Sequence, residues 1–222
     1  MWSDIFYPDN PKRREQLIRK SQQFQDLMEG NFRATNDLID VMNEHLSCSF
    51  QHITLNENVT LRENSNVMIE CIHKIQAVVE KIDTDLKEKL DPALYEKLKV
   101  LNLSLPPDQL KSLSIAIKTV CGVEGMKATA VVSILIHTGD ILGNLVSKIG
   151  KIGAGTLACV GLAVVFIGID MIVEAILGSV ERDKLEKALK EYDEVLNEFK
   201  PASEKYQRNI MKVQVKIEEI KN

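Results

Sequence analysis

Residues 152–169 read IGAGTLACVGLAVVFIGI, which is eighteen residues without a charged side chain. Lys151 precedes this stretch and Asp170 follows it. About 20 apolar residues are enough for a helix to cross the hydrocarbon core of a bilayer. The stretch therefore predicts a membrane-spanning helix, with its main span at about 152–174. The alternative is a central helix that is buried inside a soluble bundle.

The segment before this stretch is also apolar but makes a poor span by itself. Residues 128–147 read ATAVVSILIHTGDILGNLVS, with His137 and Asp140 near the middle. An ionised aspartate at the centre of a bilayer costs at least about 2.5 kcal/mol. Gly139 and Gly143 form a GxxxG pair, which lets two helix backbones approach closely. Together with the following stretch, the segment predicts a Gly/Ala-rich apolar helical hairpin.

The regions on either side are polar and are typical of solvated helices. Ten of the eleven glycines lie between Gly122 and Gly178, and all six prolines lie outside that interval. The chain therefore predicts an all-α fold with three parts. These are an N-terminal helical coiled-coil arm at 1–110, a membrane-associated segment at 111–178 and a C-terminal coiled-coil helix at 179–222.

Both arms carry apolar residues at the alternating spacing of four and three that marks a helix-packing seam. The first arm has this seam at Met68, Ile72, Ile75, Val79, Ile82 and Leu86. The second has it at Leu185, Leu189, Tyr192, Leu196, Phe199, Tyr206, Ile210, Val213, Ile217 and Ile220, interrupted at Ser203. Asp91-Pro92 predicts that the first arm kinks or restarts there. The seams predict an elongated bundle or coiled-coil arms, with the partner helix in the same chain or in another.

A different period occurs at residues 51–62. Apolar residues alternate in Gln51-His52-Ile53-Thr54-Leu55 and again in Val59-Thr60-Leu61, with Asn56-Glu57-Asn58 between them. Alternation on both sides of turn-forming residues predicts a small β-hairpin, which would have to pack on the helices to be stable.

The number of membrane crossings decides what the arms can do. If only 152–174 spans the bilayer, the two arms lie on opposite sides and cannot pair with each other. If residues 112–178 form a re-entrant hairpin or two spans, both arms lie on one side and can pack together.

Composition and motifs give no catalytic, cofactor-binding or metal-binding residues. The 28 basic and 32 acidic residues are nearly balanced, which argues against nucleic acid as a partner. His45, Cys48 and His52 have the spacing of a helical zinc site, but no fourth ligand is evident. No nucleophile, base and acid can be grouped, so we expect no enzyme activity, no cofactor and no small-molecule substrate.

Several short motifs are shared with a known family. They are Tyr7-Pro8-Asp9-Asn10-Pro11-Lys12-Arg13-Arg14-Glu15, Leu90-Asp91-Pro92-Ala93-Leu94-Tyr95, Gly168-Ile169-Asp170-Met171-Ile172, Ala175-Ile176-Leu177-Gly178 and Ala202-Ser203-Glu204-Lys205-Tyr206. On these motifs the chain resembles the single-pass membrane and coiled-coil domain-containing protein family. The resemblance implies a membrane protein with coiled-coil segments and no catalytic residues.

Two functions remain open from the sequence. The first is a non-enzymatic integral membrane protein that acts as a membrane-anchored scaffold or interaction protein. Its partners would be the lipid bilayer and a helical protein, or a second copy, bound through the heptad seams. The alternative is an α-helical membrane-inserting protein, pore-forming or remodelling, that conceals its hydrophobic hairpin. Both place the protein at a membrane.

Overall fold

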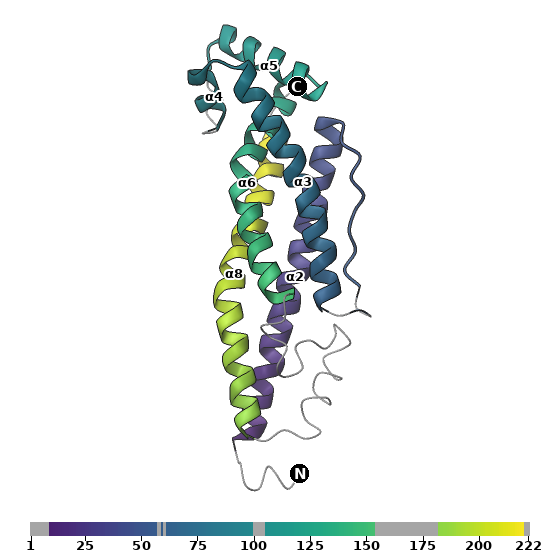
Figure 1. Cartoon of the computed structure of the whole chain (residues 1–222), viewed down its shortest axis with the longest axis vertical. Helices are drawn as coiled ribbons and strands as arrows, with labels where there is room; N and C mark the ends of the chain where they lie inside the picture. Colours follow the sequence, from purple (N-terminus) through teal and green to yellow (C-terminus); the bar gives the residue numbers. More distant parts are fainter. Residues whose placement is uncertain (1–8, 57–58, 60, 100–104, 154–181, 220–222) are drawn as a thin grey trace. The chain divides into compact units, whose positions relative to one another are not determined.

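The computed structural model describes residues 9–56, 59, 61–99, 105–153 and 182–219. These residues form helices and connecting segments (Figure 1). The helices are α2 (Asn10–Leu46), α3 (Leu61–Lys89), α4 (Pro92–Lys99), α5 (Pro107–Cys121), α6 (Met126–Gly153) and α8 (Arg182–Glu219). The predicted all-α helical bundle is confirmed. The predicted main span at 152–174 lies outside the described residues except for its first two positions.

The helix ends follow from local sequence. Asp91 separates α3 from α4, and its Oδ1 accepts the backbone N–H groups of Ala93 at 2.8 Å and Leu94 at 3.2 Å. An aspartate in that position satisfies N–H groups that the first turn leaves unpaired. Helix α5 ends at Gly122, which has a φ of 73° and donates its N–H to the carbonyl of Lys118. The predicted restart at Asp91-Pro92 is therefore confirmed.

The predicted β-hairpin at 51–62 is wrong, because the described part of this region contains no strand. Its backbone hydrogen bonds go to asparagine side chains instead. The amide of Asn43 donates to the carbonyl of Phe50 and accepts its N–H, both at 2.9 Å. Asn36 makes the same pair of bonds with Ile53, at 2.8 and 2.9 Å. An extended segment therefore lies along α2 without a partner strand.

The spacing of these two asparagines matches the spacing of the residues that they bind. Seven residues of helix separate Asn36 from Asn43, which is about 10.5 Å at 1.5 Å per residue. Three extended residues separate Phe50 from Ile53, which is about 10 Å at 3.3 Å per residue. The two lengths agree, so both amides can hold the segment at once. Asn64 binds the backbone N–H and carbonyl of Asn56 in the same way, both at 2.9 Å.

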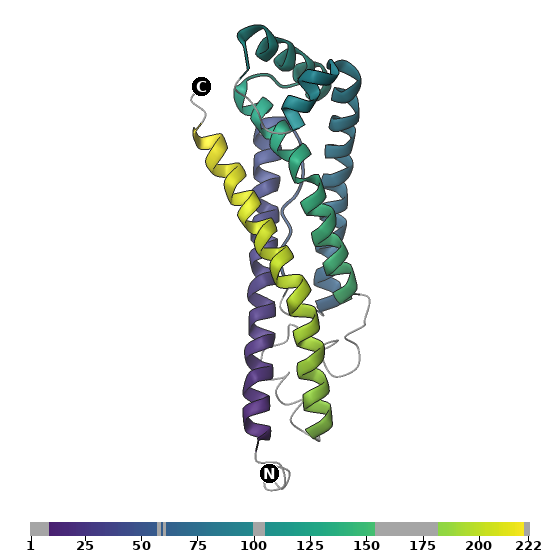
Figure 2. The same cartoon turned by 90° about the vertical axis from the view of Figure 1, so that its left-hand side faces the viewer.

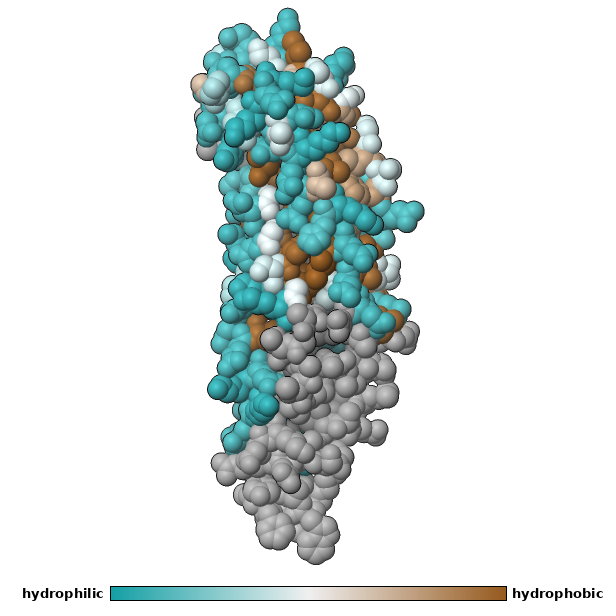
Figure 3. All heavy atoms as spheres, in the orientation of Figure 1, coloured by the Kyte–Doolittle hydropathy of each residue, from teal (hydrophilic) through white to brown (hydrophobic). Residues whose placement is uncertain are grey.

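The chain divides into two compact units, each built from three stretches of sequence. Unit 1 contains Met1–Phe32, Thr54–Glu70 and Leu145–Glu204, and unit 2 contains Arg33–Ile53, Cys71–Asn144 and Lys205–Asn222. In unit 1 the core includes Leu17, Phe24, Met28, Met68, Leu145, Ile149, Tyr192 and Phe199. In unit 2 it includes Leu38, Met42, Ile72, Ile75, Leu86, Leu113, Ile117, Val131, Leu135, Leu142, Tyr206 and Ile210. Figure 3 shows a mainly hydrophilic surface over the described residues on one face, with smaller hydrophobic areas between them.

In unit 1, α2 and α8 lie side by side and run in the same direction (Figures 1 and 2). Their contacts are Arg13 with Glu186, Lys20 with Asp193, Ser21 with Tyr192, Phe24 with Phe199, and Asn31 with Ser203. The separation along the chain stays nearly constant, for example 171 for Ser21–Tyr192 and 172 for Asn31–Ser203. A constant separation means that the two helices are parallel, so their N-terminal ends meet.

Candidate functional site

Helix α6 is the membrane candidate among the described residues. Its segment Met126–Lys151 has a mean hydropathy of 1.5, and it is the one described helix that is long and apolar enough to cross a bilayer. The same measures are met by the core helix of a soluble protein, and 56% of its most apolar window is buried. How its polar residues are placed therefore decides between these two roles.

The polar residues of α6 form one exposed stripe. His137, Asp140, Asn144, Ser147 and Lys151 are exposed and follow one another at intervals of three and four. The remaining faces of α6 are mostly buried: Val131, Leu135, Leu142 and Leu145 are each 1% exposed or less. A stripe of this kind is typical of a core helix with one solvated face. It explains why His137 and Asp140 occur within so apolar a sequence.

Two buried hydroxyl groups of α6 have hydrogen-bond partners within unit 2. Ser133 Oγ donates to the carbonyl of Leu98 at 2.6 Å, and Asn209 Nδ2 donates to Thr138 Oγ1 at 2.7 Å. Thr138 in turn donates to the carbonyl of Ile134. Because a buried polar group without a partner costs free energy, these bonds favour the packed position of α6.

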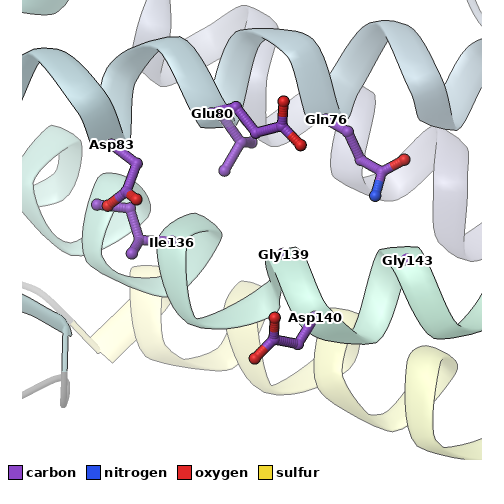
Figure 4. Close-up of a pocket in the computed structure, with 8 residues that line it drawn as sticks. Gln76, Glu80, Asp83, Ile136, Gly139, Asp140 and Gly143 are labelled. Atoms are coloured by element: carbon purple, nitrogen blue, oxygen red, sulfur yellow. The ribbon is translucent and has the colours of Figure 1, made fainter.

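A cleft of about 380 Å³ lies between α3 and α6 in unit 2. Its lining includes Gln76, Val79, Glu80 and Asp83 from α3 and Ile136, Gly139, Asp140 and Gly143 from α6. Figure 4 shows Gly139 and Gly143 on the side of α6 that faces α3. The predicted GxxxG pair therefore borders a cleft, and at Gly143 a Cβ atom would stand 3.5 Å from the Gln76 amide nitrogen.

The chemistry of the cleft is that of an acidic, polar surface. Tyr95 donates its hydroxyl hydrogen to Asp83 Oδ1 at 2.8 Å. Burial, together with this bond and the charge of Asp83, raises the pKa of Tyr95 to about 12. Glu80, Asp83 and Asp140 supply negative charge, but the lining contains no serine, cysteine, lysine or histidine that could act as a nucleophile with a base beside it. The cleft therefore offers charge and no catalytic pair.

The structure does not bring the predicted zinc-spaced residues together as a site. His52 Nε2 lies 2.6 Å from Asp40 Oδ1, and His45 lies beside Glu44. Burial raises the pKa of the Cys48 thiol. Across the described ranges, no group of three His, Cys, Asp or Glu residues is placed to hold a metal ion.

In unit 1, the C-terminal end of α6 is tied to α8 by two ion pairs. Glu198 Oε2 accepts hydrogen bonds from Lys148 Nζ at 2.7 Å and Lys151 Nζ at 3.0 Å. These two lysines lower the pKa of Glu198 to about 2, so the carboxylate stays ionised over a wide pH range. The pairs show that α6 ends beside the middle of α8.

Polar residues also join α2 to α8 inside the packed seam. Ser21 Oγ donates to Tyr192 Oη at 2.7 Å, and Asn31 Nδ2 donates to Ser203 Oγ at 2.9 Å, both in unit 1. The hydroxyls of Thr35 and Tyr206 lie 2.9 Å apart in unit 2. Ser203, which interrupts the apolar seam in the sequence, is fully buried, and its hydroxyl oxygen accepts the hydrogen bond from Asn31. Seven-residue spacing could locate Ser203 in the seam, but it could not find its partner.

Comparison with known proteins assigns the chain to a family. A family model described as "Protein of unknown function (DUF4533)" matches residues 13–172. The chain belongs to this family. The matched region begins in α2 and contains α3 to α6 completely, whereas α8 follows it. No solved structure matches the chain.

Proposed function

We propose that this protein is a non-enzymatic, membrane-associated scaffold whose two arms pair with each other on one side of the bilayer. In this proposal the apolar sequence between α6 and α8 contacts lipid, and the paired helices present surfaces to a helical protein partner. The observation that carries the proposal is that α8 contacts both α2 and α6.

The contacts bear on the number of membrane crossings. Lys148 and Lys151 of α6 bind Glu198, and α2 pairs with α8 from Arg13–Glu186 to Asn31–Ser203. A single crossing between α6 and α8 would place a hydrocarbon core of about 30 Å between these partners. None of the contacts could then form. They support a chain that returns to the side from which it entered.

The placement of α6 supports the same topology. Its polar stripe, including Asp140 and Asn144, is exposed, and its apolar faces are packed inside the units. The lipid contact therefore falls to the uncharged sequence 152–169 rather than to α6. The resemblance to the single-pass membrane and coiled-coil family supports membrane association, whereas a single pass conflicts with the helix pairing.

Membrane extraction tests the proposal directly. The full chain, tagged at both ends, is expressed in cells, and the membranes are washed with alkaline carbonate and treated with protease. We expect retention in the membrane pellet with both tags on the same side. Tags on opposite sides would establish a single span and refute the pairing. Complete release by carbonate would refute the lipid contact of 152–169.

A disulfide cross-link tests the pairing in the membrane-bound protein. In a chain whose four native cysteines are changed to alanine, Asn31→Cys and Ser203→Cys replace two side chains that share a 2.9 Å hydrogen bond. Mild oxidation should join them and shift the mobility of the chain on a non-reducing gel. The matched control combines Asn31→Cys with Asn197→Cys, an exposed position on α8. Equal cross-linking of both variants, or of neither, would contradict the proposed pair.

A second candidate function is insertion of a concealed hydrophobic helix, and one observation favours it. Helix α6 combines the length of a span with an apolar face that unit 2 hides. Acidification or anionic vesicles would then expose it. Protease treatment with and without vesicles distinguishes the two functions. In a scaffold, α6 keeps its packed position, so its cleavage is the same in both conditions. An inserted α6 is protected by the bilayer only after membrane binding.

A further inference from the structure

The parallel pairing of α2 and α8 brings two basic stretches of sequence to one end of unit 1. Residues 9–20 and 182–193, which lie level with each other because Lys20 binds Asp193, together contain nine basic and six acidic residues, whereas the rest of the chain contains 19 basic and 26 acidic residues. Arg13 binds Glu186 and Lys20 binds Asp193, so the two stretches lie side by side. An acidic protein thus has one basic end.

The charged groups at this end are accessible. Lys12 is exposed, and the side chains of Arg19, Lys187 and Lys190 are 76%, 59% and 78% exposed. Three of the four have a carboxylate neighbour one helical turn away, such as Glu15 beside Arg19. Ion pairs this exposed are weak and are readily exchanged for other anions. The four residues are called the basic end below.

The beginning of α2 departs from the usual charge pattern of a helix. Its first turn contains no acidic residue, and Lys12, Arg13 and Arg14 stand there instead. A helix N-terminus carries partial positive charge and is stabilised by negative groups. Because α8 is parallel, its N-terminus adds positive potential at the same end. An external anion at this end would compensate the first turn of α2.

The neighbouring sequence indicates which anion this is. Residues 171–181 read MIVEAILGSVE, with Glu174 and Glu181 as the charged residues, and α8 begins at the next residue, Arg182. A chain that leaves an apolar segment at a membrane first meets the phosphate groups of the lipids. Basic residues at that level are attracted to an anionic leaflet. Nucleic acid has the same charge, but it does not account for the adjacent apolar sequence.

We propose that the basic end, formed by Lys12, Arg19, Lys187 and Lys190, binds the headgroups of anionic phospholipids. This proposal rests on the proposed membrane association. It specifies, in addition, which end of the α2–α8 pair faces the lipid. The apolar sequence supplies binding to any bilayer, and the basic end supplies the preference for a negatively charged one. Raising the salt concentration weakens only the second contribution, since salt screens exposed charges.

Vesicle partitioning of the full chain tests the proposal. The vesicles are made of phosphatidylcholine alone or with about 30% phosphatidylserine, a fraction chosen to give a negative surface potential. The test variant carries Lys12→Gln, Lys187→Gln and Lys190→Gln, and the control carries Lys87→Gln, Lys89→Gln and Lys212→Gln, three exposed lysines of unit 2. Circular dichroism verifies that both are folded.

We expect the natural chain to prefer anionic vesicles and the test variant to lose about fivefold in partitioning for each lysine removed. Binding of the test variant to neutral vesicles should stay unchanged, and the control should keep the anionic preference. Equal binding of the natural chain to both vesicles, or an unchanged preference in the test variant, would overturn the basic end while leaving the proposed function intact. No binding to either vesicle would overturn the proposed function itself. Tighter binding of a short duplex DNA than of anionic vesicles would assign the basic end to nucleic acid.

Discussion

At the scale of single residues, amide side chains take the place that a partner strand would have. Asn36 and Asn43 each bind both the N–H and the carbonyl of one residue in the extended segment. An amide has a donor and an acceptor side by side, as a peptide group of a neighbouring strand does. The alternation of residues 51–55 predicts a strand, and the described part of this region contains none. The pairing partner cannot be predicted from it, because the asparagines lie in a helix that shows no matching period.

Replacing Asn43 by aspartate tests this role with almost no change in shape. The carboxylate can still accept the N–H of Phe50 but can no longer donate to its carbonyl, which it would repel. We expect the free energy of unfolding to fall by about 1–3 kcal/mol. Hydrogen exchange should show faster exchange at the Phe50 amide. Asn144→Asp, at an exposed position of α6, is the control. Unchanged protection at Phe50 would contradict the assigned bonds.

Two buried tyrosines predict a loss of stability at alkaline pH. Burial raises the pKa of Tyr192 to about 12 and raises that of Tyr206 further above its usual range, against a usual value of about 10. The folded state therefore holds these protons more tightly than the unfolded state. Their stabilising contribution is complete below pH 10 and is lost as the pH rises through the folded-state values.

Absorbance titration near 295 nm, followed together with circular dichroism, measures this effect. Ionisation of Tyr192 and Tyr206 should occur late and coincide with unfolding, and Tyr95, whose pKa is also raised to about 12, should titrate in the same range. Tyr192→Phe and Tyr206→Phe should each reduce the dependence of stability on pH above 10. Reversible ionisation of all tyrosines near pH 10 in a folded protein would contradict the burial of these two hydroxyls.

At the scale of whole elements, the seams of the arms are the best-predicted feature. Met68, Ile72, Ile75, Val79, Ile82 and Leu86 of α3 are all buried, as are Tyr192, Leu196, Phe199, Tyr206, Ile210, Val213 and Ile217 of α8. Leu189 of the predicted α8 seam is half-buried, and the side chains of Leu185 and Ile220 lie outside the described part of the chain. Period alone identifies a buried face, because a helix repeats its faces every three to four residues. It says nothing about which helix covers that face. That α8 packs against α2, and in a parallel direction, depends on specific side-chain pairs such as Asn31–Ser203.

The exposed stripe of α6 gives a test of its role as a core helix. Asp140→Lys together with Asn144→Lys should leave the free energy of unfolding within about 0.5 kcal/mol, since both positions face solvent. If α6 crossed a bilayer, two lysines near its centre would cost roughly 2.5–3.5 kcal/mol each and reduce membrane retention. Chemical denaturation and carbonate extraction measure the two effects. Leu135→Lys with Leu142→Lys, on the buried face, should instead unfold unit 2.

At the scale of the whole molecule, the sequence identifies an apolar centre but does not determine how the flanking helices meet. The uncharged stretch 152–169 satisfies the length rule for a span, and α6 satisfies a similar rule although it is packed. Both rules consider only the number of apolar residues along the chain. Helix α8 contacts α6 through Glu198, which binds Lys148 and Lys151. These lysines lie 50 and 47 positions before Glu198 in the sequence. Contacts at such separations have no signature in local sequence.

Replacing residues 154–181 by a flexible linker tests whether the helices fold without the apolar segment. Helix α6 ends beside Glu198, and α8 begins sixteen residues earlier at Arg182, which is about 24 Å along its axis. A Gly/Ser linker of sixteen residues has a root-mean-square span of about 22 Å and can extend further, so it can join the two ends. We expect a chain that is soluble without detergent and still forms the Asn31→Cys/Ser203→Cys cross-link. It should no longer be retained by carbonate-washed membranes.

A linker of four residues, which reaches at most about 14 Å, should disrupt the α6–α8 ion pairs and is the control. Unfolding of the protein that carries the sixteen-residue linker would mean that residues 154–181 belong to the packed core. The proposed lipid contact of residues 152–169 would then have to be withdrawn.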